Sequence, residues 1–421
     1  MVLRKPSLLG GRPAFVGRGV PVARPTLPEP GLLMRGLVSI LTGDSLTNGP
    51  TVQELERRAA SYAGVPHAVA VSSCTAGLTL TLRCLGLEGE VILPSFTFCA
   101  TAHAAAWNGL VPVFADIDPH TWNLDPRRVE EAVTPRTSAI VAVHVFGNPC
   151  AVEELEAIAR RFGLALVVDA AHAFGSRRGP RPVGCAGAAE VFSLSPTKVL
   201  VAGEGGLVTT RDPALAARLR DARNYGHSGD YDCHLVGMNA RMGEMNALLA
   251  RAGLELLEVW LARRERLVGL YREALNGLDG IEFQSIRPED RSTFKDLTVC
   301  IDPDRFGLSR DELAVALEAE GISTKKYFYP PVHEQAVYRG RGLALHPPGL
   351  PVTARVSRRA LSLPLYSHMP EEEIAIVAGA IRDIHREREA VRRWLRDHGE
   401  PGASPAHRGG VEGGYQVLPA V

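Results

Sequence analysis

The chain has 421 residues, of which 45% are hydrophobic and 22% charged, ordinary values for a globular protein with a large core. Lys and Arg total 47, as do Asp and Glu, so the net charge of +0 argues against binding nucleic acid or a membrane through a basic surface. No apolar run approaches the roughly 18 residues of a membrane-spanning helix, and the first 30 residues lack a secretory h-region, so we expect a cytoplasmic protein. The seven scattered cysteines, with no CxxC pair, indicate neither a disulfide framework nor a zinc site.

Residues 1–45 are predicted to form an irregular N-terminal arm with one short apolar stretch at 31–41. Strands and helices then alternate. The predicted strands are 67–72, 90–94, 111–115, 138–145, 164–168, 190–194 and 206–210, and the predicted helices are 75–85, 97–107, 126–133, 151–162 and 213–223. Several strands are continuous apolar runs, which indicates burial on both faces of a mostly parallel sheet covered by helices. Residues 46–255 are therefore predicted to form a large α/β domain.

A smaller α+β domain is predicted over 256–397. A long helical segment at 244–275, with a break, leads into it. The other predicted elements are strands at 283, 298–301 and 322–327 and helices at 310–320 and 371–396. The segment 398–421 is rich in glycine, proline and alanine and is predicted to be disordered.

An aspartate, Asp169, stands at the C-terminal end of the apolar strand in Leu166-Val-Val-Asp-Ala-Ala-His172. Ligands of open α/β sheets bind at that edge. A carboxylate there is costly unless it meets a cation or hydrogen-bond donors. A helix cap or a structural ion pair is the alternative interpretation.

A single lysine, Lys198, follows the strand that ends at Ser193, and Gly203-Glu-Gly-Gly206 comes soon after. A lysine whose pKa is lowered by desolvation forms Schiff bases with aldehydes. An isolated loop lysine is more often a solvated charge. Its place about 30 residues after Asp169, beside glycines that allow close backbone approach, favours a functional role.

Two further turns lie at strand ends. Ser72-Ser-Cys-Thr75-Ala-Gly77 opens a helix, whose N-terminal N–H groups favour a phosphate, although an ordinary N-cap explains the same residues. Pro94-Ser-Phe-Thr-Phe98 places an aromatic ring where it would stack on a planar ligand, although such a ring is more often core. With Asp169 and Lys198, these turns describe one ligand with a phosphate, a ring nitrogen and an aldehyde, which is pyridoxal 5′-phosphate (PLP).

The chain resembles the DegT/StrS-type family of PLP-dependent sugar aminotransferases, which have the fold type I architecture of aspartate aminotransferase. The resemblance runs from about Gly49 to at least Tyr366. Its motifs lie at 49–56, 73–75, 94–98, 112–116, 134–137, 144–147, 169–172, 192–198, 203–206 and 237–241. It implies a three-layer PLP-binding large domain with a smaller α+β C-terminal domain.

The resemblance also implies roles for individual residues. Lys198 would attach the cofactor and move the proton, and Asp169 would keep the pyridinium nitrogen protonated. Five more residues would surround the cofactor: Phe98 and His172 would contact its ring, and Cys74, Thr75 and Ser193 would bind its phosphate. Asn239 would reach the phosphate from the neighbouring subunit, which implies a homodimer with shared active sites.

Two positions depart from the family pattern. Cys74 stands where glycine is usual, so its side chain is expected to crowd the phosphate cup, or to serve as an oxidation-sensitive thiol. His172 stands where glutamine is common. Lys198 itself is intact, whereas family dehydratases carry histidine there.

The implied reaction moves an amino group from L-glutamate to a keto sugar, in amino-sugar or natural-product biosynthesis. The segment from Ser323 to His333 resembles one that lines the acceptor site. It offers Lys325, Lys326, Tyr327 and His333 as substrate contacts, although solvated lysines on an exposed strand are the alternative. A dTDP-4-keto-6-deoxyhexose is the favoured acceptor. A cyclitol of the scyllo-inosose type, a 3-keto nucleotide sugar and an aminodehydroquinate-forming reaction are the alternatives.

Two other classes of protein are weighed against an aminotransferase. A non-catalytic cofactor-binding regulator is disfavoured by the intact Lys198 and Asp169. A cysteine desulfurase would need Cys74 or Cys99 as its nucleophile, yet both precede the lysine and lie on the predicted cofactor-binding face.

Overall fold

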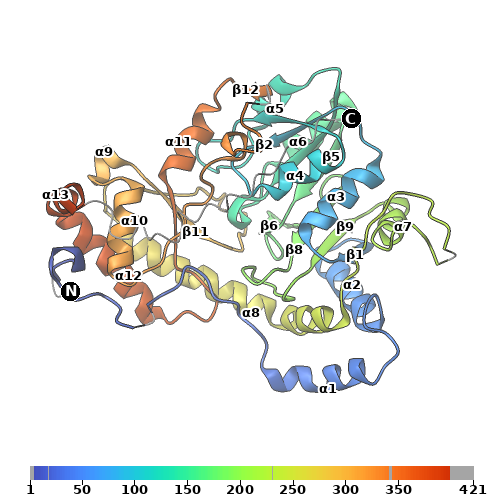
Figure 1. Cartoon of the computed structure of the whole chain (residues 1–421), viewed down its shortest axis with the longest axis horizontal. Helices are drawn as coiled ribbons and strands as arrows, with labels where there is room; N and C mark the ends of the chain where they lie inside the picture. Colours follow the sequence, from blue (N-terminus) through green and yellow to red (C-terminus); the bar gives the residue numbers. More distant parts are fainter. Residues whose placement is uncertain (1–3, 18, 230, 341–343, 399–421) are drawn as a thin grey trace, which may run out of the picture.

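The computed structural model describes residues 4–17, 19–229, 231–340 and 344–398. They form a large and a small domain joined by one long helix, α8 (Glu244–Leu275). Figure 1 shows α8 running from beneath the large domain to the small domain. The segment 399–421, which contains nearly all of the predicted disordered tail, lies outside the described residues. Within the described part of the chain, no helix has the length and apolar character needed to cross a membrane.

The large domain is built on a sheet with the strand order β1-β9-β8-β5-β4-β2-β3-β12. All pairs are parallel except those of β9, which runs antiparallel to β1 and β8. The strands are β1 (His67–Val71), β2 (Glu90–Pro94), β3 (Val111–Ala115), β4 (Thr137–Val143), β5 (Ala165–Asp169), β8 (Ala189–Ser193), β9 (Gly206–Thr210) and β12 (Ala344–His346). The predicted strands of this domain are thus confirmed, with ends shifted by one or two residues.

Helices cover both faces of this sheet because successive side chains of its strands alternate between two apolar layers. On one face Val167 and Val191 pack with α3 (Cys74–Leu85), α4 (Ala100–Trp107) and α7 (Pro213–Ala222). The other face meets α5 (Pro126–Ala132) and α6 (Val152–Phe162) through residues such as Val168, and α2 (Pro50–Ala63) with α8 through residues such as Phe192. The three-layer α/β architecture expected from the sequence is present.

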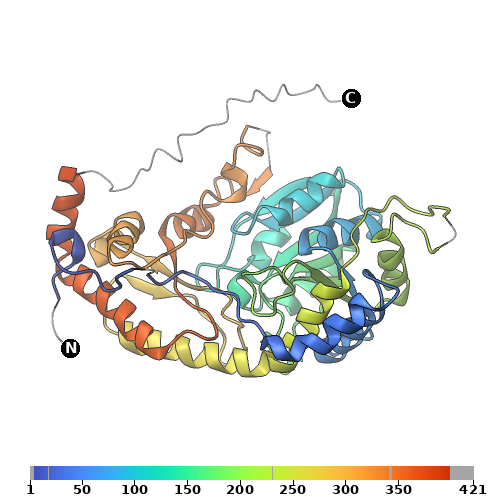
Figure 2. The same ribbon diagram turned by 60° about the horizontal axis from the view of Figure 1, so that its bottom comes forward.

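The small domain contains an antiparallel sheet of β10 (Ile281–Phe283), β11 (Leu297–Ile301) and β13 (Ala360–Leu363). Its helices are α9 (Pro303–Phe306), α10 (Arg310–Ala319), α11 (Pro351–Arg359), α12 (Glu371–Arg386) and α13 (Arg388–His398). All of these except α11 contribute to a core that includes Tyr271 of α8, Phe306 and Tyr366. Val356 of α11 packs instead with Phe96 and Phe146 of the large domain. Figure 2 shows α12 lying alongside α8, so the two helices pack against each other.

Two helix predictions are wrong in detail. The predicted break within 244–275 is absent, because α8 packs along its length against α2 at one end and α12 at the other. The single helix predicted over 371–396 is two helices, α12 and α13, separated at Glu387. The break redirects α13 so that Val391 and Leu395 enter the core of the small domain.

Two segments were assigned the wrong structure. The stretch 31–41, predicted to be part of an irregular arm, lies in the helix α1 (Pro30–Leu41), which packs against α8. Gly36 allows this approach, since a Cβ there would come within 2.4 Å of a Leu248 methyl carbon. The predicted strand at 322–327 is irregular. Only isolated bridges, Val20 with Ile322 and Lys325 with Ser362, pair its backbone, because the residues that follow turn into a cavity.

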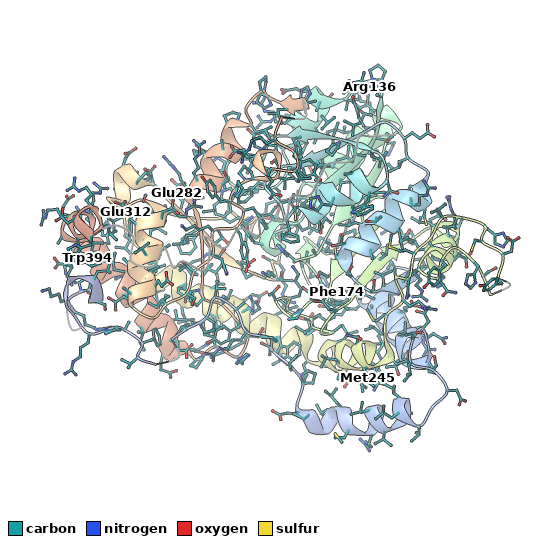
Figure 3. The ribbon with its side chains drawn as sticks, viewed as in Figure 1. Arg136, Phe174, Met245, Glu282, Glu312 and Trp394 are labelled. Carbon is teal, nitrogen blue, oxygen red and sulfur yellow. The ribbon has the colours of Figure 1, made fainter. Side chains whose placement is uncertain are left out.

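The orientation of the sheet decides where ligands bind. Arg136, just before β4, lies at the end of the large domain far from the small domain (Figure 3). The N-terminal ends of the parallel strands therefore face outward, and their carboxyl ends face the small domain. Binding sites of such sheets lie at the carboxyl ends.

Candidate active site

A cavity of about 280 Å³ lies where the carboxyl ends of β5 and β8 meet the small domain. It brings together residues from distant parts of the chain. Its lining residues are Ser73, Cys74, Thr75, Phe98, Ala100, Asp169, Ala171, His172, Ser193, Ser195, Thr197, Lys198, Glu204, Lys295, Asp296, Tyr327 and Phe328. The predicted residues Lys198, Asp169, Phe98, His172, Cys74, Thr75 and Ser193 are all among them.

The Asp169 carboxylate is buried in the wall of this cavity, with 5% of the residue exposed. Burial raises the pKa of Asp169. Two donors act in the opposite direction: Thr101 Oγ1 donates to Oδ2 at 2.7 Å, and the Ala171 N–H donates to Oδ1 at 3.0 Å. The hydroxyls of Thr97 and Thr101 lie 2.9 Å apart and are both buried. Thr101, which itself bonds to the Thr97 hydroxyl, thus fixes the position of the Asp169 carboxylate. The position suits a cationic ligand group.

The half-buried Lys198 follows β8, and its N–H donates to the Ser195 carbonyl. Burial lowers the pKa of Lys198 to about 8, and the Lys295 ammonium is the next cause. A substantial fraction of this amine is therefore neutral near pH 8, the form that attacks a carbonyl.

The start of α3 forms one end of the cavity. Ser73 caps the helix by accepting from the Ala76 N–H at 3.1 Å, which leaves the N–H groups of Cys74 and Thr75 directed out of the first turn. Gly206 permits this packing, because a Cβ there would lie 2.7 Å from the Cys74 nitrogen. Ser193 and Ser195 add hydroxyls to the same cavity, so the helix start suits an anion such as phosphate.

The Cys74 side chain does not point into the mouth of this helix start, contrary to the crowding expected from the sequence. Its Sγ lies 3.5 Å from the Val191 carbonyl and 3.9 Å from Asp169 Oδ1. Burial, followed by the charge of Asp169, raises the pKa of the Cys74 thiol well above its usual value. Burial also raises the pKa of Cys99. Neither thiol has the lowered pKa that a nucleophilic or redox-sensing cysteine needs.

Two rings flank the cavity. His172 lies parallel to Phe328, at 6.4 Å between ring centroids, and accepts at Nδ1 from the Phe146 N–H. Burial, with the charge of Lys198 second, lowers the pKa of His172 well below its usual value, so the imidazole is neutral. Phe98 is 60% exposed, an unusual state for a phenyl ring and one that leaves its face free for a planar ligand.

These residues fit PLP. The start of α3 suits its phosphate, Asp169 its ring nitrogen, Phe98 its ring and Lys198 its aldehyde. The cofactor supplies an electron sink for carbanions when bound.

Asn239 is not among the residues that line the cavity of its own chain. It is exposed and accepts from Arg241 Nε at 3.2 Å. Its neighbours Val236, Gly237 and Met238 line a second cavity of about 600 Å³, which shares Ser73 and Thr75 with the first.

Of the residues predicted to bind substrate, only Tyr327 lines the first cavity. Lys325 and Lys326 are exposed, and Lys326 Nζ lies 2.5 Å from Asp311 Oδ1. The His333 ring bonds instead to the Ser95 hydroxyl at 2.7 Å.

Sequence reasoning missed Lys295 and Asp296, which enter the cavity just before β11, and Thr101, which bonds to Asp169. Thr101 lies only three residues after Phe98, so the helix predicted to follow the 94–98 motif could have indicated it. The Lys295-Asp296 pair carries no motif, and only the meeting of the two domains brings it to the cavity.

Comparisons with known proteins identify the family of the chain. The model of the DegT/DnrJ/EryC1/StrS aminotransferase family matches residues 33–382. The chain is 36% identical to a dTDP-4-amino-4,6-dideoxy-D-glucose transaminase of Escherichia coli, over 84% of this chain and 95% of that protein. It is 38% identical to a dTDP-3-amino-3,4,6-trideoxy-alpha-D-glucose transaminase of Streptomyces venezuelae, over 80% of this chain and 87% of that protein.

Solved structures show the same fold. The structure of DesI, determined in the presence of its TDP-sugar product, superposes with a TM-score of 0.87 at 42% sequence identity. The match covers 93% of this chain and 99% of DesI.

The first prediction concerns Thr101 as a positioning residue for Asp169. Thr101→Val should weaken PLP binding and lower kcat/KM by roughly 10- to 100-fold, the range for losing a hydrogen bond to a charged group. Loss of this donor raises the pKa of Asp169 further, so the acidic limb of the pH–rate profile should move to higher pH. Thr101→Ser keeps the hydroxyl, so it should restore kcat/KM and the position of the acidic limb. An unshifted acidic limb in Thr101→Val would contradict the positioning role.

The second prediction concerns the protonation of Lys198. In cofactor-free protein, trace acetylation of Lys198 followed by peptide mass spectrometry should reach half its maximal rate at about pH 8. The sign follows from burial, which disfavours the charged amine, whereas an ordinary lysine reacts fully only above about pH 10. A half-maximum near pH 10 would refute the desolvated state of Lys198.

Proposed function

This chain belongs to the DegT/DnrJ/EryC1/StrS aminotransferase family, whose members depend on PLP, and we propose that it moves an amino group from L-glutamate to a dTDP-4-keto-6-deoxyhexose. The observation that carries the proposal is the geometry of one cavity, which brings Lys198 and the start of α3 together with Asp169, itself held by Thr101 at 2.7 Å and the Ala171 N–H at 3.0 Å. The pKa directions support it. The pKa of Asp169 is raised and that of Lys198 is lowered, mainly by the same desolvation.

The residues of the site have distinct tasks in this reaction. Lys198 would hold the cofactor through its Nζ, and the same amine is the base that would take a proton from the α-carbon of the amino donor. Asp169 holds the proton on the ring nitrogen, which keeps the ring electron-poor. The start of α3, with Thr75 and Ser193, binds the phosphate and fixes the position of the ring.

The acceptor enters from the side of the small domain. Tyr327 lines the cavity there, and the exposed Lys325 and Lys326 directly precede it in the chain. We assign the diphosphate of the nucleotide sugar to Lys325, whose compact ammonium group suits it. Lys326, whose ammonium is paired with Asp311, lies beside it in the chain. His333, whose ring bonds to Ser95, is assigned to support this wall of the site.

A 3-keto nucleotide sugar is the second candidate acceptor, since the relative from Streptomyces venezuelae is named for a 3-amino sugar. Two of the other acceptors considered from the sequence, the cyclitol and the aminodehydroquinate precursor, have no such relative among the proteins compared above. Both remain useful members of a substrate panel.

We also propose a homodimer in which Asn239 completes the partner's phosphate site. Asn239 lies outside its own cavity, and exposed apolar side chains surround it, with Trp107 81% and Val236 69% exposed. Exposed apolar groups of this size are typical of surfaces that another protein covers.

The third prediction tests the reaction. Purified holoenzyme should convert L-glutamate to its 2-oxo acid and aminate dTDP-4-keto-6-deoxyglucose, as followed by mass spectrometry against a panel of 3-keto nucleotide sugars and scyllo-inosose. Lys198→Ala should abolish turnover, because Lys295, the other lysine of the described cavity lining, is held in an ion pair with Asp296. Amination of scyllo-inosose alone would exclude a nucleotide sugar, and normal turnover by Lys198→Ala would exclude the mechanism.

The fourth prediction tests the shared site. Lys198→Ala and Asn239→Ala should each be nearly inactive, yet an equilibrated equal mixture should recover about one quarter of wild-type activity, because half of the dimers then contain one intact site. The matched control mixes Lys198→Ala with Asp169→Ala, whose defects lie on the same side of the site and should not complement. Equal activity of both mixtures, or a monomer in sedimentation, would contradict a shared site.

A further inference from the structure

Lys295 and Asp296 form a buried ion pair in the wall of the active-site cavity. Lys295 Nζ lies 2.9 Å from both carboxylate oxygens of Asp296, and the two residues are only 5% and 6% exposed. Both nevertheless line the cavity. The pair reaches the cavity from the small domain, whereas the start of α3 belongs to the large domain.

The loop that carries this pair is fixed by buried hydrogen bonds. The Arg264 guanidinium, from α8, donates to the carbonyls of Phe294 and Lys295. Thr293 Oγ1 donates to the His172 carbonyl, and the Lys295 N–H donates to the Phe146 carbonyl at 3.0 Å. The loop of the small domain is therefore held rigidly against the large domain, as a recognition site requires.

Stability alone does not account for the pair. A buried ion pair gives little net stabilisation, and apolar residues of similar volume are often as stable or more so. Here both residues line a cavity, so the donors and acceptors that they do not use between themselves can bond to a ligand. The ammonium has three donors, and the carboxylate accepts through two oxygens.

The chemistry of the pair selects a neutral hydroxyl over an anion. A donor carboxylate or a diphosphate that approached Lys295 would also approach the Asp296 carboxylate and be repelled by it. A hydroxyl both donates and accepts, so it can bond to both members. The Tyr327 ring, whose centroid lies 5.2 Å from Lys295 Nζ, adds a flat apolar face beside them.

The pair lies close to the reacting centre. Lys295 and Asp296 line the same cavity of about 280 Å³ as Lys198 and His172. The Lys295 ammonium is also, after burial, a cause of the lowered pKa of Lys198. We therefore place the sugar hydroxyl that bonds to Lys295 and Asp296 on a ring carbon next to the carbon that gains the amine. In a 4-keto-6-deoxyhexose this is the 3-hydroxyl, because the other neighbouring carbon bears the methyl group.

We propose that Lys295 and Asp296 together recognise the sugar hydroxyl next to the reacting carbonyl and so determine which keto sugars are accepted. This inference rests on the proposed function, since it assumes a keto sugar as acceptor. It assigns no role in the half-reaction with L-glutamate to either residue.

The test removes both charges at once. Lys295→Met with Asp296→Asn leaves the net charge of the cavity unchanged and buries no unpaired ion. Binding to the holoenzyme is measured by calorimetry with two unreactive ligands, dTDP-6-deoxyglucose and its 3-deoxy counterpart. The glutamate half-reaction is followed separately by cofactor absorbance. The matched control, Arg305→Met with Asp279→Asn, removes an exposed ion pair of the small domain.

Wild-type enzyme should bind dTDP-6-deoxyglucose roughly 10- to 100-fold more tightly than the 3-deoxy ligand, the range for hydrogen bonds to charged groups. The double variant should bind both ligands equally and weakly, and the control should behave as wild type. The glutamate half-reaction of the double variant should change less than its sugar binding, because Lys295 and Asp296 shift the pKa of Lys198 in opposite directions and both are removed. If the double variant does not fold, as judged by thermal unfolding, Lys295→Gln with Asp296→Asn replaces it.

Three outcomes would overturn the inference. The first is discrimination between the two ligands by the double variant, and the second is equal binding of both ligands by wild type. A glutamate half-reaction slowed as much as sugar binding would assign Lys295 to the donor carboxylate instead. Failure of the proposed function is distinguishable, because wild-type enzyme would then aminate no nucleotide sugar in the panel.

Discussion

Desolvation of the cavity between the two domains is the constraint on which this site depends. The same loss of water raises the pKa of Asp169 and lowers that of Lys198, so the charged form of each group is disfavoured. Thr101 and the Ala171 N–H offset the cost for the carboxylate. A ligand with a cationic ring nitrogen and an aldehyde satisfies both groups, which explains why one small cavity fits PLP.

The two domains contribute different parts of this chemistry. Side chains at the carboxyl ends of the large sheet and at the start of α3 account for all of the predicted cofactor contacts except Asn239. The small domain adds Lys295, Asp296, Tyr327 and Phe328. The α8 helix and its Arg264 hold these loops in place against the large domain. Cofactor binding and acceptor selection are thus assigned to separate elements that share one cavity.

Sequence reasoning succeeded where a local physical signal was strong. The buried strands of the large sheet are continuous apolar runs, so their positions were predicted to within a residue or two. It failed where contacts between distant residues decide the outcome. The α1 helix depends on packing against α8 at Gly36, and the turn at Glu387 depends on burial of Val391 and Leu395. Likewise, the stretch predicted as a strand at 322–327 lacks a neighbouring strand over most of its length.

The amino-acid sequence by itself determined the α/β class and the cofactor, because the buried strands are continuous apolar runs and the residues that suit PLP stand in the turns directly after such strands. Only the tertiary structure decided where the Cys74 thiol points, that Thr101 supports Asp169, and that Lys295 and Asp296 enter the cavity. These features arise from packing between segments far apart in the chain, and no local pattern of residue types encodes such packing.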